Sequence, residues 1–590
     1  MITETATALE TQEAGLAIGT AFVSGRCTGE VIASATELSF WGGADPLTGE
    51  IIDRHHPLSG HSIRDRVLAI PGGRGSCTGS AVILELILGG TAPKAMIIER
   101  ADDIITLGVV IAEETFGKSI PVVMLSHEDF ARVSAARIVR IDGGRVAFAS
   151  SEDQLPAFPD LETPANVSPD TLTLAAVDRD ILNGGRGEAA AAAMRIIVRM
   201  AKLQGAEALM DISRVHVDGC IYTGPGSLAF AEKLRDLGGR VAVPTTLNAI
   251  SVDHRQWRSL SVDPAFGEPA AALADAYVAM GAEQTFTCAP YLLDRVPQFG
   301  EQIAWAESNA VVFANSVIGA RTNKYPDFLD ICIALTGRAP RSGPHLAELR
   351  MPELRFDVTD IEAADDALYP LLGYCIGARS PSQIPIVHGL EQLAPSIDDL
   401  KAFGAAFATV SAAPMFHIAG ITPEAGNGLA GDLPAMRIGR AELAKSWREL
   451  DAGEGTDVDL VSFGNPHFSH REIAALADRL EGRKKNANVA VIVTCGRAEY
   501  QRAADSGTVA RLDTFGVRFL TDICWCMITE PIIPPQARTI MTNSGKYAHY
   551  GPGLTGRSFR FGSLEGCVEA ACSGTARHEL PHWLNGANGA

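Results

Sequence analysis

The sequence lacks any apolar stretch long enough for a membrane-spanning helix. No run of about 18 apolar residues in the 590-residue chain is free of charged residues and helix breakers. Its first residues, "MITETATALETQEAG", are acidic and polar, whereas a secretory signal starts with a basic segment and continues with an apolar one. We therefore expect no membrane span and a cytoplasmic location.

Positive charge is also scarce. The chain has 50 Lys and Arg against 70 Asp and Glu, which gives a formal net charge of −20. Nucleic acids and anionic membrane surfaces are usually bound by basic patches. We therefore expect neither of them as a partner, although one Arg or Lys can still hold a small anion locally.

The cysteines lack the paired spacing of zinc sites. None of the 11 cysteines forms a C-x-x-C pair. In a reducing cytoplasm we do not expect disulfides between them. Most are therefore predicted to be buried core thiols, and a few remain candidates for a metal site.

The chain is too long for a single hydrophobic core, so we expect two to four domains. Residues 1–150 contain several strand-like runs and two predicted helices, one after a glycine-rich turn and one at "HEDFARVS". Residues 151–170 are rich in proline and acidic residues and predict a linker. From residue 171 to 590, strands and helices alternate. This alternation is typical of α/β layers with parallel sheets, so the predicted fold class is α/β.

The glycine-rich turn "PGGRGSCTGS" (71–80) lies between a strand-like run and a helix-like run. It has no lysine, which a phosphate-binding P-loop requires. Three interpretations remain open. The turn is purely structural, or Cys77 is a nucleophile in a G-x-C-x-G elbow, or Ser76 is a base at a helix start. In the last case Arg74 and the backbone N–H groups would stabilise negative charge on the Ser76 oxygen.

Polar residues also gather at two other places. The segment "AWAESNAVVFANSVIGARTN" (304–323) mixes amides and hydroxyls with apolar residues, which indicates a buried network or a ligand pocket. Arg321 within it is a candidate clamp for a carboxylate. His216 and His467 follow apolar runs, where a hydrogen-bonded structural role is the alternative. In "SFGNPHFSHREIAALADRL", a capping box from Ser469 predicts a helix start and places "GNPH" in the preceding loop.

Several of these segments together resemble the aconitase X family. The matching motifs are "GRGSCTGS", "TTLNA", "TCAPY", "AWAESNAVVFANSVIGARTN", "NPHFS" and "NSGKYAHY", and they occur in the expected order over nearly the whole chain. The resemblance implies a β-rich swivelling small domain fused ahead of a large catalytic region. It also implies a hydro-lyase with an iron–sulfur cluster held by three cysteines. Fused members resemble cis-3-hydroxy-L-proline dehydratases, and archaeal two-chain members resemble mevalonate 5-phosphate dehydratases.

The resemblance assigns the catalytic serine to Ser76. It suggests Cys375, Cys524 and Cys567 as cluster ligands, with Cys288 in reserve. In many relatives a cysteine stands where this chain has Asn465, so Cys375 is the predicted replacement. The changed ligand set favours a 2Fe–2S cluster and leaves a 4Fe–4S cluster open. The residues predicted to bind substrate are Arg74, His216, Asn315, Arg321 and Lys546.

The predicted reaction is dehydration of cis-3-hydroxy-L-proline to 1-pyrroline-2-carboxylate. Ser76 removes the Cα proton and an under-coordinated iron takes the C3 hydroxyl. The alternatives are dehydration of another hydroxy acid such as mevalonate 5-phosphate, an RNA-binding regulator, and the Cys77 hydrolase. The prediction requires Ser76 to face the gap between the two parts, and the thiols of Cys524 and Cys567 to lie close together. The oligomeric state is left open.

Overall fold

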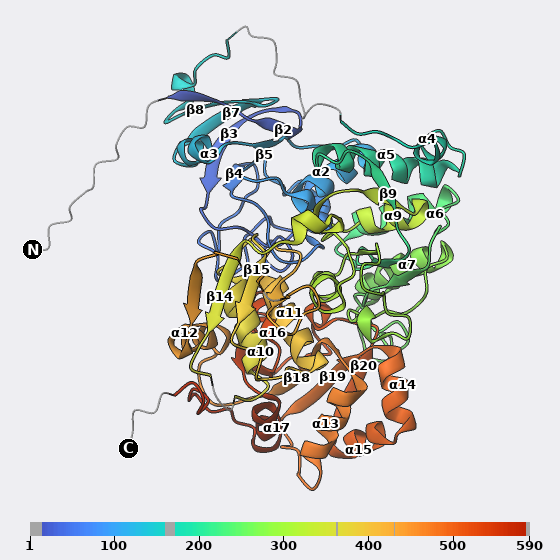
Figure 1. Cartoon of the computed structure of the whole chain (residues 1–590), viewed down its shortest axis with the longest axis vertical. Helices are drawn as coiled ribbons and strands as arrows, with labels where there is room; N and C mark the ends of the chain where they lie inside the picture. Colours follow the sequence, from blue (N-terminus) through green and yellow to red (C-terminus); the bar gives the residue numbers. More distant parts are fainter. Residues whose placement is uncertain (1–13, 160–170, 362–363, 427, 430, 586–590) are drawn as a thin grey trace, which may run out of the picture.

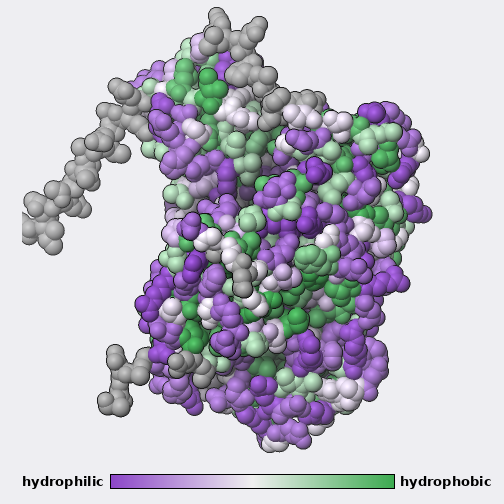
Figure 2. Space-filling view, in the orientation of Figure 1, coloured by the Kyte–Doolittle hydropathy of each residue, from purple (hydrophilic) through white to green (hydrophobic). Residues whose placement is uncertain are grey.

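The fold is taken from a computed structural model, which describes residues 14–159, 171–361, 364–426, 428–429 and 431–585. A sheet domain formed by residues 15–149 lies at one end of the molecule, at the top of Figure 1, and the larger part lies below it. The helices described include none that is both long and apolar enough to cross a bilayer. Polar residues cover most of the face shown in Figure 2.

The N-terminal domain is built on an eight-stranded sheet with the order β1-β8-β7-β3-β4-β5-β6-β2. Its central strands β3 to β6 are parallel, and the outer pairs are antiparallel. The strands are β1 (Gly15–Ile18), β2 (Thr20–Val23), β3 (Arg26–Ala33), β4 (Val67–Ile70), β5 (Ala95–Ile98), β6 (Val122–Met124), β7 (Ile138–Asp142) and β8 (Arg145–Ala149). The helices are α1 (Gly79–Gly89), α2 (Asp103–Phe116) and α3 (His127–Ser134).

The expectation of two helices in this domain was wrong, because α2 is a third. Its sequence "DIITLGVVIAEETF" is rich in β-branched residues, which favour strands in isolation. The capping residues at the two ends of the segment favour a helix. Asp102 accepts a hydrogen bond from the Ile105 N–H at the start, and Gly117 takes a left-handed conformation at the end.

The glycine-rich turn connects β4 to α1 at the carboxyl end of the strand, as predicted. Gly75 within it has a φ of +79°, a backbone conformation that L side chains rarely adopt. This turn therefore projects residues 74–78 beyond the sheet and toward the larger part of the protein.

The larger part contains three successive α/β layers, and their main sheets are parallel. This confirms the predicted fold class. The first layer has the sheet β11-β10-β12 and the antiparallel pair β13-β9. Its elements are β9 (Leu209–Asp211), β10 (Val215–Val217), β11 (Thr245–Leu247), β12 (Ala304–Trp305), β13 (Arg338–Pro340), α4 (Ala176–Leu182), α5 (Glu188–Leu203), α6 (Pro225–Asp236), α7 (Pro264–Ala279), α8 (Ser308–Phe313) and α9 (Leu329–Thr336).

The second and third layers follow in sequence. Their sheets have the orders β16-β15-β14-β17 and β20-β19-β18-β21-β22. The second layer contains β14 (Leu354–Val358), β15 (Pro385–His388), β16 (His417–Ile418), β17 (Ala435–Ile438), α10 (Leu368–Gly377), α11 (Ile397–Val410) and α12 (Arg440–Leu450). The third contains β18 (Leu460–Phe468), β19 (Ala490–Cys495), β20 (Val517–Thr521), β21 (Thr539–Thr542), β22 (Ser558–Phe561), α13 (His470–Leu480), α14 (Arg497–Asp505), α15 (Thr508–Phe515), α16 (Gly545–Thr555) and α17 (Leu564–Ser573). Helices α13, α14 and α15 lie at the lower end of Figure 1.

Two local predictions have different outcomes in the third layer. The capping box is confirmed, because the Ser469 hydroxyl accepts from the Glu472 N–H and α13 starts at the next residue. The placement of "GNPH" (464–467) in a loop was wrong. These residues continue β18, whose pairing with β19 shifts register between Phe463 and Phe468.

The predicted linker 151–170 is described only in its first half. Residues 151–159 contain a short 3-10 turn at Glu152–Gln154. The remaining predicted linker residues, 160–170, lie outside the described residues.

Candidate active site

The glycine-rich turn of the N-terminal domain contacts the first layer of the larger part. The Ser308 hydroxyl at the start of α8 donates to the Gly75 carbonyl at 3.3 Å and accepts from the Cys77 N–H at 3.3 Å. The Asp327 N–H, just before α9, donates to the Cys77 carbonyl at 3.3 Å. Ser76 therefore lies at the boundary between the two parts, where the prediction requires it.

The surroundings of Ser76 favour negative charge on its oxygen. The side chain is 8% exposed, and the Thr78 N–H at the start of α1 donates to its Oγ at 3.3 Å. The positive end of the α1 dipole is directed at the same place. Both groups favour negative charge on the Ser76 oxygen, and burial opposes it.

Next to the turn, a buried polar network runs into the larger part. The Asn248 amide donates to Asp218 and, at 3.0 Å, to Glu307 Oε2. Lys546 Nζ donates to Glu307 Oε1 at 2.9 Å. Burial alone would raise the pKa of Glu307, but the Lys546 ammonium holds it below its usual range. Glu307 is therefore an ionised carboxylate paired with a buried cation.

Three cysteine thiols meet beyond Lys546. Hydrogen bonds from Cys288 and Cys526 lower the pKa of the Cys524 thiol well below its usual range, and Lys546 adds to the effect. Cys288 follows α7, Cys524 directly precedes the short 3-10 turn Trp525–Met527 after β20, and Cys526 lies within that turn. We call Cys288, Cys524 and Cys526 the thiol cluster.

Backbone and amide groups of β18 donate to the sulfurs of this cluster. The His467 N–H donates to Cys288 Sγ at 3.3 Å, and the Asn465 amide donates to Cys526 Sγ at 3.4 Å. The carbonyl oxygen of the Asn465 side chain is buried and accepts no hydrogen bond from the residues that the structure describes. Two of the three sulfurs therefore accept N–H hydrogen bonds, and the pKa values of Cys288 and Cys526 are raised well above the usual range by burial and by Cys524. Among the described residues, no group of three or more His, Cys, Asp or Glu side chains is placed so that it could hold a metal ion.

The predicted ligand set of Cys375, Cys524 and Cys567 is not brought together. Each of the three belongs to a different hydrophobic cluster of the protein. Cys375 lies in α10, where Arg379 donates to its sulfur at 3.0 Å, and burial raises its pKa. Cys567 is buried in the core of the third layer, and burial raises its pKa well above the usual range. These two are core thiols, and Cys288 and Cys526 take their place beside Cys524.

Among the predicted substrate-binding residues, Lys546 and His216 belong to this region. His216 lies on β10, two residues before Asp218, and its Nδ1 is 2.8 Å from the Thr246 hydroxyl. Burial lowers the pKa of His216 to about 4, so the ring is neutral. Its Nε2 is buried and, within the described residues, makes no well-formed hydrogen bond, although the Thr287 backbone lies close enough to raise the pKa of the ring.

The other three predicted substrate-binding residues, Arg74, Arg321 and Asn315, form hydrogen bonds with other groups of the protein. Arg74 stays within the N-terminal domain, donating to Asp53 at 2.9 Å and to the Glu37 carbonyl at 3.0 Å. Arg321 donates to the His345 carbonyl at 3.2 Å.

The substrate-binding prediction is wrong for Asn315, because its side-chain amide is fully used. Its Nδ2 donates to the carbonyls of Thr322 and Pro414. Its Oδ1 accepts from the Thr322 N–H and from Arg350. No donor or acceptor remains for a substrate.

The Cys77 nucleophile interpretation also fails. The thiol is fully buried, and burial raises its pKa well above the usual range. A nucleophilic cysteine needs the opposite shift. The Ser308 hydroxyl lies 3.7 Å from the Cys77 sulfur.

Sequence reasoning did not commit to Asp218, Asn248 or Glu307. Asp218 and Asn248 directly follow the ends of β10 and β11, and Glu307 follows β12. These three strands are neighbours in one parallel sheet. Polar residues at carboxyl ends of parallel strands are the signal that would have found them.

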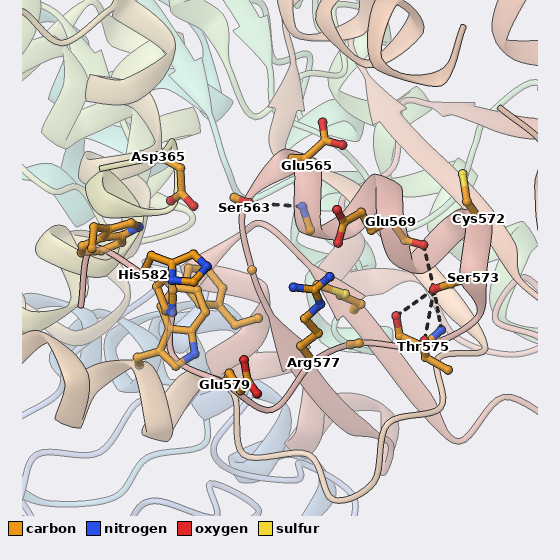
Figure 3. A pocket seen from close by; sticks show the side chains of 18 of the residues that line it. Asp365, Ser563, Glu565, Glu569, Cys572, Ser573, Thr575, Arg577, Glu579 and His582 are labelled. Atoms are coloured by element: carbon orange, nitrogen blue, oxygen red, sulfur yellow. Dashed lines mark hydrogen bonds between the residues drawn. The ribbon is translucent and has the colours of Figure 1, made fainter. Parts of the chain in front are cut away.

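A cavity lies elsewhere on the protein. It has a volume of about 770 Å³ and lies between α17, Trp447 of α12 and the C-terminal segment that carries Arg577 and His582 (Figure 3). None of the predicted site residues lines it. The buried network around Glu307, and not this cavity, is therefore the candidate active site.

Comparison with known families assigns all the main parts of the chain. Models described as the aconitase X swivel, first, second and third domains match residues 17–148, 171–348, 352–448 and 458–573, respectively. The chain belongs to the aconitase X family. These ranges correspond to the N-terminal sheet domain and to the three α/β layers described above.

Its relatives extend over nearly the full length. The chain is 55% identical to the cis-3-hydroxy-L-proline dehydratase of Hypocrea jecorina, over 96% of this chain and 97% of that protein. It is 53% identical to the enzyme of the same name from Pseudomonas aeruginosa, over 97% and 99%. The crystal structure of aconitase X from Thermococcus kodakaraensis aligns with a TM-score of 0.62 and 29% identity, over 68% of this chain and all of that one. The phosphomevalonate dehydratase large subunit of Methanothermobacter thermautotrophicus is 34% identical, over 63% of this chain and 92% of that subunit.

Proposed function

We propose that this protein is a hydro-lyase that dehydrates cis-3-hydroxy-L-proline to 1-pyrroline-2-carboxylate. The chain is 55% and 53% identical to two enzymes of that name over nearly its full length, and this similarity carries the proposal. The geometry supports it, because Ser76 and the thiol cluster lie at opposite ends of one buried polar network that crosses the domain boundary.

Ser76 acts as the base in this proposal. Removal of a proton next to a carboxylate builds further negative charge on the substrate, so the base must be strong. The Thr78 N–H and the start of α1 stabilise the Ser76 alkoxide. The pair of electrons from the Cα–H bond forms the double bond to C3 as the C3–oxygen bond breaks. The product then isomerises to 1-pyrroline-2-carboxylate.

The thiol cluster is the proposed cofactor site. Cys288, Cys524 and Cys526 would hold an iron–sulfur cluster, of the 2Fe–2S type in preference to 4Fe–4S. When bound, the cluster would supply a Lewis acid for the departing hydroxyl. Lys546 contributes positive charge beside the three thiols. The neutral ring of His216, on the strand that leads to Asp218, is the proposed hydrogen-bonding group for the substrate.

Mevalonate 5-phosphate dehydration is the weaker candidate. The phosphomevalonate dehydratase of Methanothermobacter thermautotrophicus is less similar than the two full-length relatives: its large subunit is 34% identical over 63% of this chain, and its small subunit is 42% identical over 21%. A panel of hydroxy acids that includes mevalonate 5-phosphate separates the two activities.

The test uses anaerobically purified, iron-replete protein incubated with cis-3-hydroxy-L-proline. Formation of the pyrroline product is expected, and its absence would refute the proposed function. Ser76→Ala should lower kcat by about 10²–10⁴-fold with unchanged visible absorption of the cluster. Ser80→Ala is the matched control, because the Ser80 hydroxyl only donates to the Ile104 carbonyl inside the N-terminal domain.

A further inference from the structure

The side-chain hydroxyl of Thr78 does not cap the helix that follows it. Thr78 is the residue just before α1, where a threonine side chain usually accepts a hydrogen bond from the helix backbone. Here it makes no such bond. Its Oγ1 accepts from the Ser76 hydroxyl at 3.2 Å and donates to Asp218 Oδ2 at 3.4 Å. A serine of one domain is thereby connected to a carboxyl group of another.

Asp218 in turn lies against a second carboxyl group, that of Asp327. Both side chains are fully buried. Neither oxygen of Asp327 accepts a hydrogen bond from any N–H or O–H placed in the described part of the chain. Burial and Asp218 raise the pKa of Asp327, as expected for two buried carboxyl groups that share one proton. A pair that shares one proton carries a single negative charge and can take up a second.

We propose that Thr78 and the Asp218–Asp327 pair form a proton relay that activates Ser76. This inference rests on the proposed function of Ser76 as the base. The Ser76 hydroxyl passes its proton to Thr78 Oγ1, and Thr78 passes its own to Asp218 Oδ2. One O–H bond breaks at Ser76 and one forms at Asp218, while Thr78 exchanges one proton for another.

The number of protons on the relay is the same before and after one catalytic cycle. Ser76 takes the Cα proton of the substrate in place of the proton it gave to the relay. The proton equivalent held by the carboxyl pair is released before the next cycle. Overall, the proton lost from Cα and the hydroxyl lost from C3 leave as one water molecule, so no net charge accumulates.

The carboxyl pair has the proton affinity that this role needs. Burial, and the charges of Glu307 and Asp330, raise the pKa of Asp218 well above its usual range. Burial and Asp218 do the same for Asp327. A raised pKa brings a carboxylate closer to that of an alcohol, which makes proton transfer from a serine less unfavourable.

A purely mechanical role for the Thr78 hydroxyl is not required by the contacts. Ser308 already binds the turn through the Gly75 carbonyl and the Cys77 N–H. Asp327 N–H binds it through the Cys77 carbonyl. The turn is therefore attached to the larger part by three hydrogen bonds that do not involve Oγ1.

The test compares Thr78→Val, which keeps the shape and removes the hydroxyl, with Thr78→Ser, which restores a hydroxyl. Turnover of cis-3-hydroxy-L-proline and thermal midpoints are measured on iron-loaded protein. We expect Thr78→Val to lower kcat about 100-fold, with KM within about twofold and the midpoint nearly unchanged. Thr78→Ser should recover most of the kcat. Asp327→Asn gives a second arm and should also lower kcat and leave KM unchanged.

The outcomes separate this inference from the proposed function. If the wild-type protein does not convert the substrate, the function itself is refuted. If the wild type is active and Thr78→Val matches its kcat, the relay is refuted. Should Thr78→Val fail to fold, an Asp327→Asn variant that is folded and as fast as the wild type overturns the relay.

Discussion

Lys546 Nζ lies 2.9 Å from Glu307 Oε1, and both side chains are more than nine-tenths buried. This contact connects the thiol cluster in the third layer with the polar ends of the strands in the first layer. Because a buried ion pair is stable only while both partners are present, it also fixes the relative position of α16 and the start of α8.

Breaking this pair should be costly. We expect Glu307→Gln or Lys546→Met alone to destabilise the protein by about 3–5 kcal/mol, because each leaves one buried charge without its partner. The double variant should be less destabilised than either single variant but should stay inactive. Thermal midpoints and turnover measure both effects. Arg235→Ala, in an exposed ion pair with Asp236, is the control and should shift the midpoint little.

The thiol cluster predicts which cysteines retain iron. Cys288→Ala, Cys524→Ala and Cys526→Ala should each lose iron, acid-labile sulfide and the visible absorption. Cys375→Ala and Cys567→Ala are matched controls, since both are buried thiols in hydrophobic cores. They should keep the iron even where they lower stability. Loss of iron in a control, together with its retention in Cys288→Ala and Cys526→Ala, would contradict the assignment.

Alanine at position 75 should impair turnover far more than alanine at position 90. Both Gly75 and Gly90 have a positive φ, so alanine costs about 1–2 kcal/mol of backbone strain at either position. A Cβ on Gly75 would lie 2.4 Å from the Tyr550 hydroxyl, whereas a Cβ on Gly90 meets nothing within 4 Å. Gly75→Ala should therefore abolish turnover by displacing the turn, and Gly90→Ala should lower only the thermal midpoint. Equal turnover in the two variants would contradict the close contact between the glycine-rich turn and the larger part of the protein.

The raised pKa of Glu85 should make the free energy of unfolding depend on pH. It lies on α1, accepts a hydrogen bond from the Ser227 N–H of α6 at 3.0 Å, and burial raises its pKa from 4.5 to about 7. Between these values the folded protein keeps a proton that the unfolded chain has lost. Stability therefore falls as the pH rises through this interval, and the loss of about 3 kcal/mol is complete above pH 7.

Glu85→Gln removes this titration and keeps an acceptor for Ser227. The thermal midpoint of the variant, relative to the wild type, should rise between pH 5 and pH 8. Glu128→Gln on the exposed surface of α3 is the control and should show a constant difference. A constant difference for Glu85→Gln as well would show that this carboxyl group does not titrate abnormally.

The sequence alone was sufficient for the parts of the prediction that depend on local chemistry. The glycines and the flanking apolar runs determined the strand–turn–helix that presents Ser76. Ser469 and Glu472 determined the start of α13. The motif order identified the family. In contrast, α2 was missed because its β-branched residues favour a strand until its two caps are considered.

The tertiary structure alone decided which distant residues meet. Cys288, Cys526, Asn248 and Glu307 come from segments far apart in the chain, and nothing in their spacing indicates that they share one network. Sequence spacing likewise did not show that Cys375 and Cys567 lie in separate cores. Contacts of this kind depend on how the ends of parallel strands and the turns after them come together when the layers pack, and local sequence does not encode that arrangement.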